Sequence, residues 1–142
     1  MANLLDKFKK NVIGSSGKYI DYTAKLNSSG EFHRITNLET ILNSWSNILL
    51  TPKRSYDHDP EFGCDLYKYV FEPCDTETVN SVKNEIRSSL EIYDNRAVPS
   101  KIDVLFLRDK KGFTVDIYVD YGDDEGQLSV IIDDSTYFNL NR

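Results

Sequence analysis

The chain has 142 residues, of which 39% are hydrophobic, and a formal net charge of −6. This length and composition fit one folded domain rather than a disordered chain. The acidic balance, and the lack of a Lys and Arg cluster interleaved with aromatics, argue against nucleic-acid binding. No apolar run approaches the roughly 18 residues that a membrane span requires. We therefore expect neither nucleic acid nor a membrane among its partners.

The N-terminus and the cysteines predict the compartment. The first ten residues contain no long apolar segment and no small-residue cleavage site, so we expect no secretory signal. The protein is then made and first folds in a cytoplasm. Cys64 and Cys74 lack C-x-x-C spacing, and a reducing compartment favours two free thiols.

The first predicted element is a short amphipathic helix. Leu4, Leu5, Phe8 and Val12 fall at helical spacing, and "GSSG" at residues 14–17 ends the pattern. A helix shorter than about 12–15 residues is marginal alone, so this stripe must pack on its own domain or on a neighbour. The glycine-containing hinge and the charge of this region favour a neighbour.

The residues after this helix show no clear period. Residues 18–34 carry the turn sequence "NSSG" at 27–30 and read as irregular. Residues 1–34 hold six Lys and Arg against three acids, whereas residues 35–142 hold eleven against twenty. We therefore expect an N-terminal arm over 1–34 and an ordered domain over 35–142.

Two helices are predicted in this domain. The first is a helix of about 14 residues that Pro52 stops. The second begins at Asp75 or Thr76, either of which can cap it. The first stripe comprises Leu38, Ile41, Leu42, Trp45, Ile48 and Leu49, and the second comprises Val79, Val82, Ile86, Leu90 and Tyr93.

After Pro99 the apolar period changes to two. In "GFTVDIYVDY", residues 112–121, alternate side chains from Phe113 to Tyr121 share one face, which predicts a strand with one buried face. "KIDVLFLR" at 101–108 and "QLSVIID" at 127–133 are also strand-like. The predicted fold is α+β: a small antiparallel three- to four-stranded sheet packed with two main helices, plus the N-terminal helical arm.

The stretch "DHDPEFGCDLYKYVFEPC", residues 57–74, gathers acids, a histidine and two cysteines. A zinc site wants about four ligands at fixed spacing, and here one Cys lies near His58 while His33 lies in the arm. The acids do not follow the EF-hand pattern either. We expect no metal site and no cofactor.

The same acids raise the possibility of a carboxylate enzyme. Glu61 with Asp65 or Glu72 would make a muramidase-like glycoside hydrolase if two carboxyls faced each other across a cleft. The sequence marks neither carboxyl as buried, and no second lobe is visible. A hydrolase therefore stands as the alternative function.

A mechanical interpretation of the stretch needs no catalysis. Pro60 fixes φ and biases Asp59 toward extended geometry, while Gly63 supplies a conformation that a Cβ would forbid. The stretch then reads as a stiff turn, one or two helical turns, and a break at Pro73. Its apolar anchors are Phe62, Leu66, Tyr69, Val70 and Phe71.

"DPEFGCDLYKYVFEP", residues 59–73, carries a family resemblance. It resembles the baseplate wedge and sheath-initiator family of contractile phage tails, shared with type VI secretion and related injection machines. The family pattern is an apolar helix ending in Thr, an Arg-containing loop, P-E-F-G-C, and a short helix closing on Phe. A second helix ending in Glu-Pro-Arg and a strand meander follow. The resemblance covers roughly residues 35–133.

Two positions depart from the family pattern. Glu-Pro-Arg reads here as Asp94, Asn95 and Arg96, so the acid is shortened and the proline is lost. In the loop before Pro60, Tyr56 takes the family's Arg position and Arg54 stands where Gly is expected. The chain is then a divergent member.

The resemblance implies a structural protein of the virion tail baseplate, or of an equivalent injection machine, without catalytic machinery. Its expected partners are other wedge proteins, the tail sheath, and tube or hub proteins. The Glu-Pro-Arg corner would dock on a helical bundle of other wedge proteins, and the domain would template the first sheath ring through a strand edge. The expected partner-binding residues are Asp94, Asn95 and Arg96 at the corner, Leu4, Leu5 and Phe8 in the arm, and Leu128, Val130 and Ile132 in the last strand; Pro60, Glu61, Phe62 and Gly63 form the structural motif.

Two alternatives stay open at the residue level. The Arg96 guanidinium can bind a partner carboxylate bidentately, or it can pair with Asp94 in its own chain. The edge of the last strand can accept an incoming chain, or the tail "STYFNLNR" at 135–142 can cover it.

Overall fold

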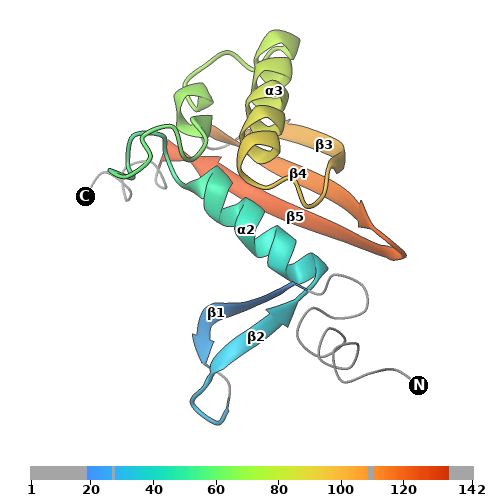
Figure 1. The fold of residues 1–142 in the computed structure, drawn as a ribbon. Helices are drawn as coiled ribbons and strands as arrows, with labels where there is room; N and C mark the ends of the chain where they lie inside the picture. The colour runs from blue at the N-terminus through green and yellow to red at the C-terminus, as the bar shows by residue number, and fades with distance from the viewer. Residues whose placement is uncertain (1–18, 27, 109–110, 135–142) are drawn as a thin grey trace. The chain divides into compact units, whose positions relative to one another are not determined.

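The computed structural model of the chain describes residues 19–26, 28–108 and 111–134 (Figure 1). The chain divides into two units, residues 1–40 and residues 41–142. The predicted helix over Leu4, Leu5 and Phe8 lies outside the described residues. The tail at 135–142, which could cover the last strand, lies outside them too.

A two-stranded hairpin opens the described chain. β1 (Ile20–Leu26) pairs antiparallel with β2 (Phe32–Thr36). The interpretation of residues 18–34 as irregular is therefore wrong. Apolar residues do alternate along β1 with the period of two that predicts a strand. Their polar neighbours and the shortness of β2 made this alternation hard to recognise. β2 also runs across the boundary predicted between residues 34 and 35, and the division into an arm and a wedge domain stays a prediction.

Helix α2 (Leu38–Leu50) confirms the first predicted helix. Ile41, Trp45 and Leu49, spaced by four residues, have fully buried side chains. The helix ends at Leu50, and the amide and hydroxyl of the next residue, Thr51, both donate to the Asn47 carbonyl oxygen, at 3.1 and 2.6 Å. Both donors on one helix-end carbonyl hold the chain in place where Pro52 stops the helix.

Helix α3 (Thr76–Tyr93) confirms the second, and Asp75 caps it. The Asp75 carboxylate accepts a hydrogen bond of 2.8 Å from the Thr78 amide. These bonds hold the pKa of Asp75 below its usual value. Val82, Ile86 and Leu90 are buried, as their spacing predicted.

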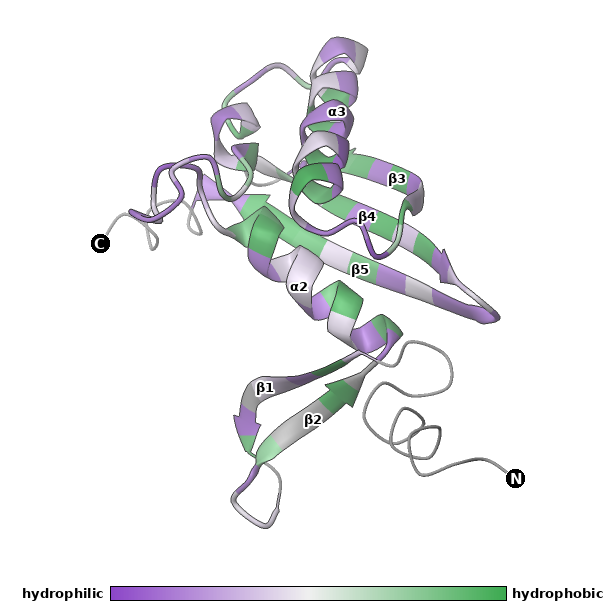
Figure 2. Ribbon diagram, in the orientation of Figure 1, coloured by the Kyte–Doolittle hydropathy of each residue, from purple (hydrophilic) through white to green (hydrophobic). Residues whose placement is uncertain are grey.

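Three strands form the antiparallel sheet in the order β3–β4–β5, and the fold is α+β as predicted. The strands are β3 (Pro99–Phe106), β4 (Gly112–Tyr121) and β5 (Asp124–Asp133). Phe113, Val115, Ile117 and Val119 of β4 are buried, as the period of two predicted. Both helices lie in front of the sheet in Figure 1, and hydrophobic stretches recur along these elements in Figure 2.

The short helix between α2 and α3 is a 3-10 turn, η1 (Leu66–Tyr69). Leu66 and Val70 are buried anchors, but the expectation for Phe71 is wrong because its side chain is exposed. Tyr67 is buried instead, with its hydroxyl 3.3 Å from the Leu50 carbonyl oxygen. The tighter 3-10 winding changes which side chains point inward, and helical spacing does not anticipate that change.

Candidate functional site

The connector between α2 and η1 closes on itself through backbone hydrogen bonds. The Cys64 amide donates to the Thr51 carbonyl oxygen at 2.9 Å, and the Arg54 amide donates to the Pro60 carbonyl oxygen at 2.8 Å. Gly63 has φ +110°, and a Cβ there would lie 2.2 Å from the Thr51 oxygen. The close return of the chain to Thr51 therefore requires a glycine at this position.

Aromatic contacts tie the connector to the end of α3. The rings of Phe62 and Tyr93 meet edge to face with centroids 5.0 Å apart, and Tyr56 meets Phe62 at 6.0 Å. Edge-to-face pairs at this separation stabilise beyond the area that they bury. Phe62 thus supports the helix end just before the corner at residues 94–96, whereas Glu61 is exposed.

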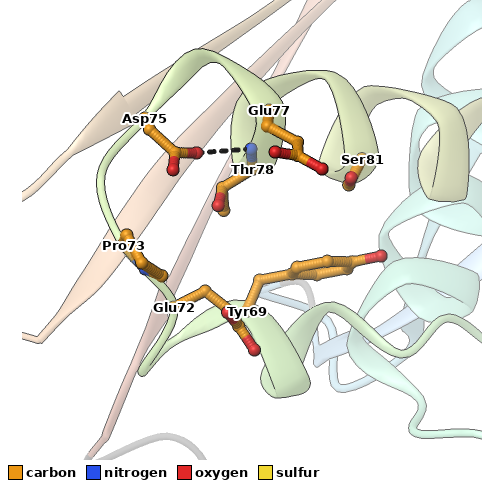
Figure 3. A pocket seen from close by; sticks show the side chains of 7 residues that line it. All are labelled: Tyr69, Glu72, Pro73, Asp75, Glu77, Thr78 and Ser81. Atoms are coloured by element: carbon orange, nitrogen blue, oxygen red, sulfur yellow. Dashed lines mark hydrogen bonds between the residues drawn. The ribbon is translucent and has the colours of Figure 1, made fainter.

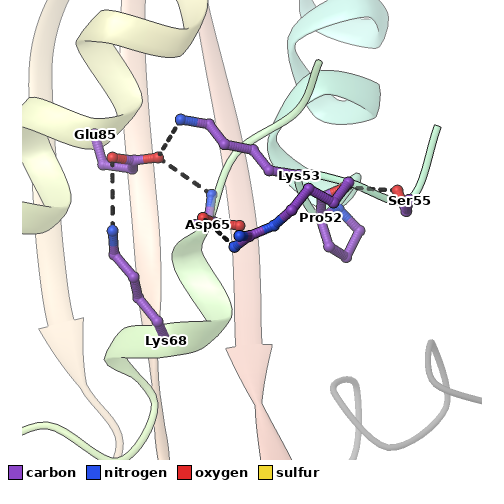
Figure 4. A network of polar contacts seen from close by, with 7 residues as sticks. Pro52, Lys53, Ser55, Asp65, Lys68 and Glu85 are labelled. Carbon is purple, nitrogen blue, oxygen red and sulfur yellow. Dashed lines mark hydrogen bonds and ion pairs between the residues drawn. The ribbon is translucent and has the colours of Figure 1, made fainter. Parts of the chain in front are cut away.

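Charged groups hold the other side of the connector (Figure 4). Glu85 on α3 accepts from the Asp65 amide at 3.3 Å and pairs with Lys53 at 3.3 Å and Lys68 at 4.0 Å. Burial disfavours the charge of Lys53, but the hydrogen bond and charge of Glu85 outweigh it and raise the Lys53 pKa. Asp65 in turn pairs with Arg54 at 3.9 Å. Some of the acids in this stretch therefore fix the shape of the connector.

The two cysteines are free and differ in environment. Cys64 is buried, and burial raises the pKa of its thiol to about 12 despite a hydrogen bond with Ser89. Cys74 is exposed. A buried thiol with a raised pKa is a packing group rather than a nucleophile.

At the corner after α3, Asp94 and Arg96 pair within the chain. The guanidinium donates from Nε to Asp94 Oδ1 at 2.7 Å and from Nη2 to Oδ2 at 2.6 Å. Burial of Asp94 opposes its charge, but hydrogen bonds from Arg96 and from Ser44 on α2 prevail and lower the Asp94 pKa. Of the two alternatives left open by the sequence, the isolated chain adopts the intramolecular pair.

Apolar side chains flank this corner, and sequence reasoning missed them. Ile92 is 71% exposed and Val98 is 78% exposed, whereas Asp94 between them is buried. Asn95 is exposed as well. Ile92 lies off the apolar stripe of α3, and that displacement was the available signal. The corner therefore combines a fixed ion pair with two solvated apolar side chains.

The candidate carboxylates differ in their surroundings. Glu72 lines a hollow of about 310 Å³ with Tyr69, Glu77 and other residues at the start of α3 (Figure 3). Glu61 and Asp65 are not among the residues lining it. Asp75, the third acid of the hollow, is engaged as the helix cap. Glu72 therefore does not face Glu61 across this hollow, as the pairing of those two carboxyls in a glycoside hydrolase would require.

The described residues offer neither a group of metal ligands nor a membrane-spanning helix. In that part of the chain, no three His, Cys, Asp or Glu side chains are grouped so that they could hold a metal ion. Nor does any helix there have the length and apolar character to cross a membrane.

The last strand presents an edge. Within the described ranges β5 pairs only with β4. The Asp134 amide donates to the Lys111 carbonyl oxygen, one step past the Gly112 and Asp133 pair. Because antiparallel bonds recur at every second residue, Leu128, Val130 and Ile132 direct their backbone groups to β4.

The outward-pointing backbone groups of β5 are those of Gln127, Ser129 and Ile131. The Ile131 side chain is 57% exposed, whereas Val130 and Ile132 are buried. Contact along this edge would therefore use residues one position away from those expected from the sequence. That an incoming chain binds here stays a prediction.

Comparison with known proteins identifies relatives over most of the chain. The family described as "Baseplate wedge protein gp25" matches residues 36–124. The chain is 32% identical over 114 residues to the baseplate wedge protein gp25 of Enterobacteria phage T4, covering 78% of this chain and 86% of that protein.

Solved structures share the fold. One is in the baseplate of the anti-feeding prophage, with TM-score 0.58 and 11% identity, covering 87% of this chain and 94% of that one. Another is in the post-contraction baseplate of pyocin R2, with TM-score 0.53 and 19% identity, covering 82% and 99%. A Geobacter sulfurreducens protein named as a proposed tail lysozyme matches with TM-score 0.56 and 20% identity, covering 80% and 99%.

Proposed function

The chain belongs to the gp25 family of baseplate wedge proteins, and from this membership we propose how it binds within a contractile tail. Its relatives are baseplate components of contractile phage tails and phage-like particles. The chain acts as a structural, non-enzymatic wedge subunit. It docks on other wedge proteins through the corner at residues 92–98 and initiates the sheath through the edge of β5.

The exposed apolar pair at the corner is the observation that supports docking there. Because Asp94 already holds the Arg96 guanidinium, Arg96 mainly fixes the shape of the turn. Ile92 and Val98 flank this rigid turn at 71% and 78% exposure. Rigid turns lose little entropy on binding, and apolar groups surrounded by polar ones favour protein contacts. A helical bundle of other wedge proteins, with an apolar groove between two helices, fits this shape.

A docking test should spare the ion pair, since removing Arg96 leaves Asp94 buried and unpaired. We expect Ile92→Glu with Val98→Glu to fold normally, because both side chains are exposed. Tagged protein carrying both changes should lose the other wedge proteins in co-purification from assembling particles. Leu105→Glu, at an exposed apolar residue of β3, is the control and should retain them. Equal recovery from both variants would contradict docking at the corner.

The outward backbone groups of β5 support the second part of the proposal. An edge strand adds an incoming strand through main-chain hydrogen bonds and needs no particular side-chain motif. Ile131→Pro removes one such amide and leaves the ladder to β4 in place. Baseplates with this variant should assemble without extending a sheath, as electron microscopy can show. Ile131→Thr keeps the amide and should give sheaths of normal length; normal sheaths on both would refute the role of this edge.

Absence of catalysis is the remaining part of the proposal. Two observations support it: neither Glu61 nor Asp65 lines the hollow of Glu72, and Asp65 is paired with Arg54. Purified protein should release no more reducing sugar from peptidoglycan than its Glu61→Gln and Glu72→Gln variants. A hydrolytic activity that either substitution abolishes would support the hydrolase as the function instead.

A further inference from the structure

Residues 52–55 form a tight turn just after α2. The Ser55 amide and hydroxyl both donate to the Pro52 carbonyl oxygen, at 3.3 and 2.6 Å. Arg54, the third residue of the turn, has φ +67°, whereas the φ of Lys53 is negative. A positive φ at the third residue alone is what a type II turn requires, and that position favours glycine or asparagine. The turn therefore holds an arginine where the backbone favours glycine.

The connector fixes Arg54 in this conformation. Its amide donates to the Pro60 carbonyl oxygen at 2.8 Å, a bond that closes the connector on itself. The left-handed region is strained for a residue with a Cβ, because the Cβ approaches the following carbonyl oxygen. The strain at Arg54 is therefore present whenever the connector is folded.

The side chain of Arg54 offers the fold little in return. It is 80% exposed, and among the described residues the one carboxylate within ion-pair distance is that of Asp65, at 3.9 Å. Exposed ion pairs contribute little to stability unless their geometry is close to ideal. A residue that breaks a local backbone rule without an internal gain is expected at a functional position. We therefore look for the role of Arg54 outside its own chain.

Positive charge gathers at the surface around Arg54. Lys53 precedes it in the turn, and Lys68 of η1 shares the Glu85 carboxylate with Lys53 (Figure 4). The side chain of Lys68 is 53% exposed. Those of Glu85 and Asp65, which pair with these cations, are only 16% and 25% exposed. The acids thus lie lower than the cations, and Arg54 and Lys68 present their charges to solvent.

The chemistry of this surface indicates the kind of partner. A guanidinium binds a carboxylate through two parallel hydrogen bonds, and the neighbouring ammonium groups add attraction. A nucleic acid would bring phosphates over a much larger area of a chain whose net charge is −6, and that charge opposes its approach. An acidic protein segment needs only the local positive charge.

We propose that Arg54, with Lys53 and Lys68, binds a carboxylate-bearing segment of a neighbouring baseplate protein. This contact is separate from the corner at residues 92–98 and from the edge of β5, and it depends on neither. The strained turn holds the backbone of Arg54 in place before binding, so less order is lost when the partner arrives.

Thermal unfolding separates a role in binding from a role in the fold. Arg54→Gly should melt at or above the temperature of the wild type, because glycine adopts positive φ without strain. It should also melt about 3 °C or more above Arg54→Ala, since both lack the guanidinium and only alanine keeps the strain. Melting of Arg54→Gly clearly below the wild type would show that the side chain serves the fold, and would overturn the proposal.

A peptide titration tests the chemistry of the surface. An acetylated hexaglutamate peptide, added to the isolated full-length protein at low salt, should shift the amide NMR signals of residues 53–55 and 68. Arg54→Gly should weaken this binding by about fivefold, the loss of one exposed ion pair. The control is Arg87→Gln, an exposed arginine two positions after Glu85 and so on another face of α3. It should bind the peptide as the wild type does.

Equal affinity of the wild type and Arg54→Gly for hexaglutamate would overturn the proposal. Tighter binding of a DNA oligonucleotide than of hexaglutamate would overturn the choice of partner. In co-purification from assembling particles, Arg54→Gly should lose a baseplate protein that Arg87→Gln retains, and equal recovery by both would also refute the contact. Since the titration uses the isolated protein, its failure would leave docking at residues 92–98 untouched.

Discussion

Replacing Gly63 by alanine tests how the connector is built. The alanine Cβ would stand 2.2 Å from the Thr51 carbonyl oxygen, at a backbone φ of +110°. The unfavourable φ costs about 1–2 kcal/mol. Relieving the overlap requires the connector to move from α2, at a cost of about 1–3 kcal/mol for an overpacked site. That movement also stretches the bond of 2.9 Å between the Cys64 amide and the Thr51 oxygen.

We therefore expect Gly63→Ala to lower the free energy of unfolding by about 3 kcal/mol. For a chain of this size the melting temperature should fall by about 10 °C. Thermal unfolding followed by circular dichroism measures the change. Gly122→Ala is the matched control, because Gly122 also has positive φ, +64°, but nothing lies within 4 Å of its added Cβ. It should cost about 1 kcal/mol, and equal melting temperatures for the two variants would refute the close approach to Thr51.

Three other changes probe the corner, the thiols and the core. Because folding lowers the pKa of Asp94, its ionised carboxylate stabilises the folded protein when the pH is above the ordinary carboxyl pKa of 3.8. This contribution is lost as the pH falls below that value. Asp94→Asn should thus destabilise by about 1.5–3 kcal/mol at pH 7, the range for hydrogen bonds to a charged group, and denaturant titrations should show this difference shrinking as the pH falls below 3.8; a difference independent of pH would contradict the Arg96 pair. Iodoacetamide at pH 8 should label Cys74 alone in the folded protein, since Cys64 is buried with a pKa of about 12, and mass spectrometry detecting two labels on the folded chain would disprove this. Ile86→Ala should cost about 2–5 kcal/mol in urea unfolding because its side chain is fully buried; a loss below 1 kcal/mol would indicate a loosely packed core.

The period of apolar residues predicted the main helices and the sheet because burial imposes that period. The stripes through Trp45 and Ile86 and the alternation through Val115 each occupy one face of a long element. The β1–β2 hairpin was missed since its apolar face is exposed and its strands are short. Phe71 was misplaced because 3-10 winding replaced the expected helical turns.

The site depends on distances that a sequence does not contain. The sequence was compatible with Arg96 binding either a partner carboxylate or Asp94 of its own chain. Only the geometry shows that the guanidinium pairs with Asp94. The sequence predicted a strand over residues 127–133 and gave Val130 as an edge contact, but the position of the outward backbone groups follows from the register with β4. The requirement for glycine at Gly63 likewise arises from the return of the connector to Thr51, twelve positions earlier along the chain.

Electron cryo-microscopy of baseplates assembled with this protein would show directly whether the corner at residues 92–98 is the docking surface. We expect the chain to lie in the wedge region, with Ile92 and Val98 in contact with a helical bundle formed by other baseplate proteins. The Asp94 and Arg96 pair should remain closed within the chain at that contact. A baseplate in which this corner faces solvent, while another surface of the chain holds the neighbouring proteins, would contradict it.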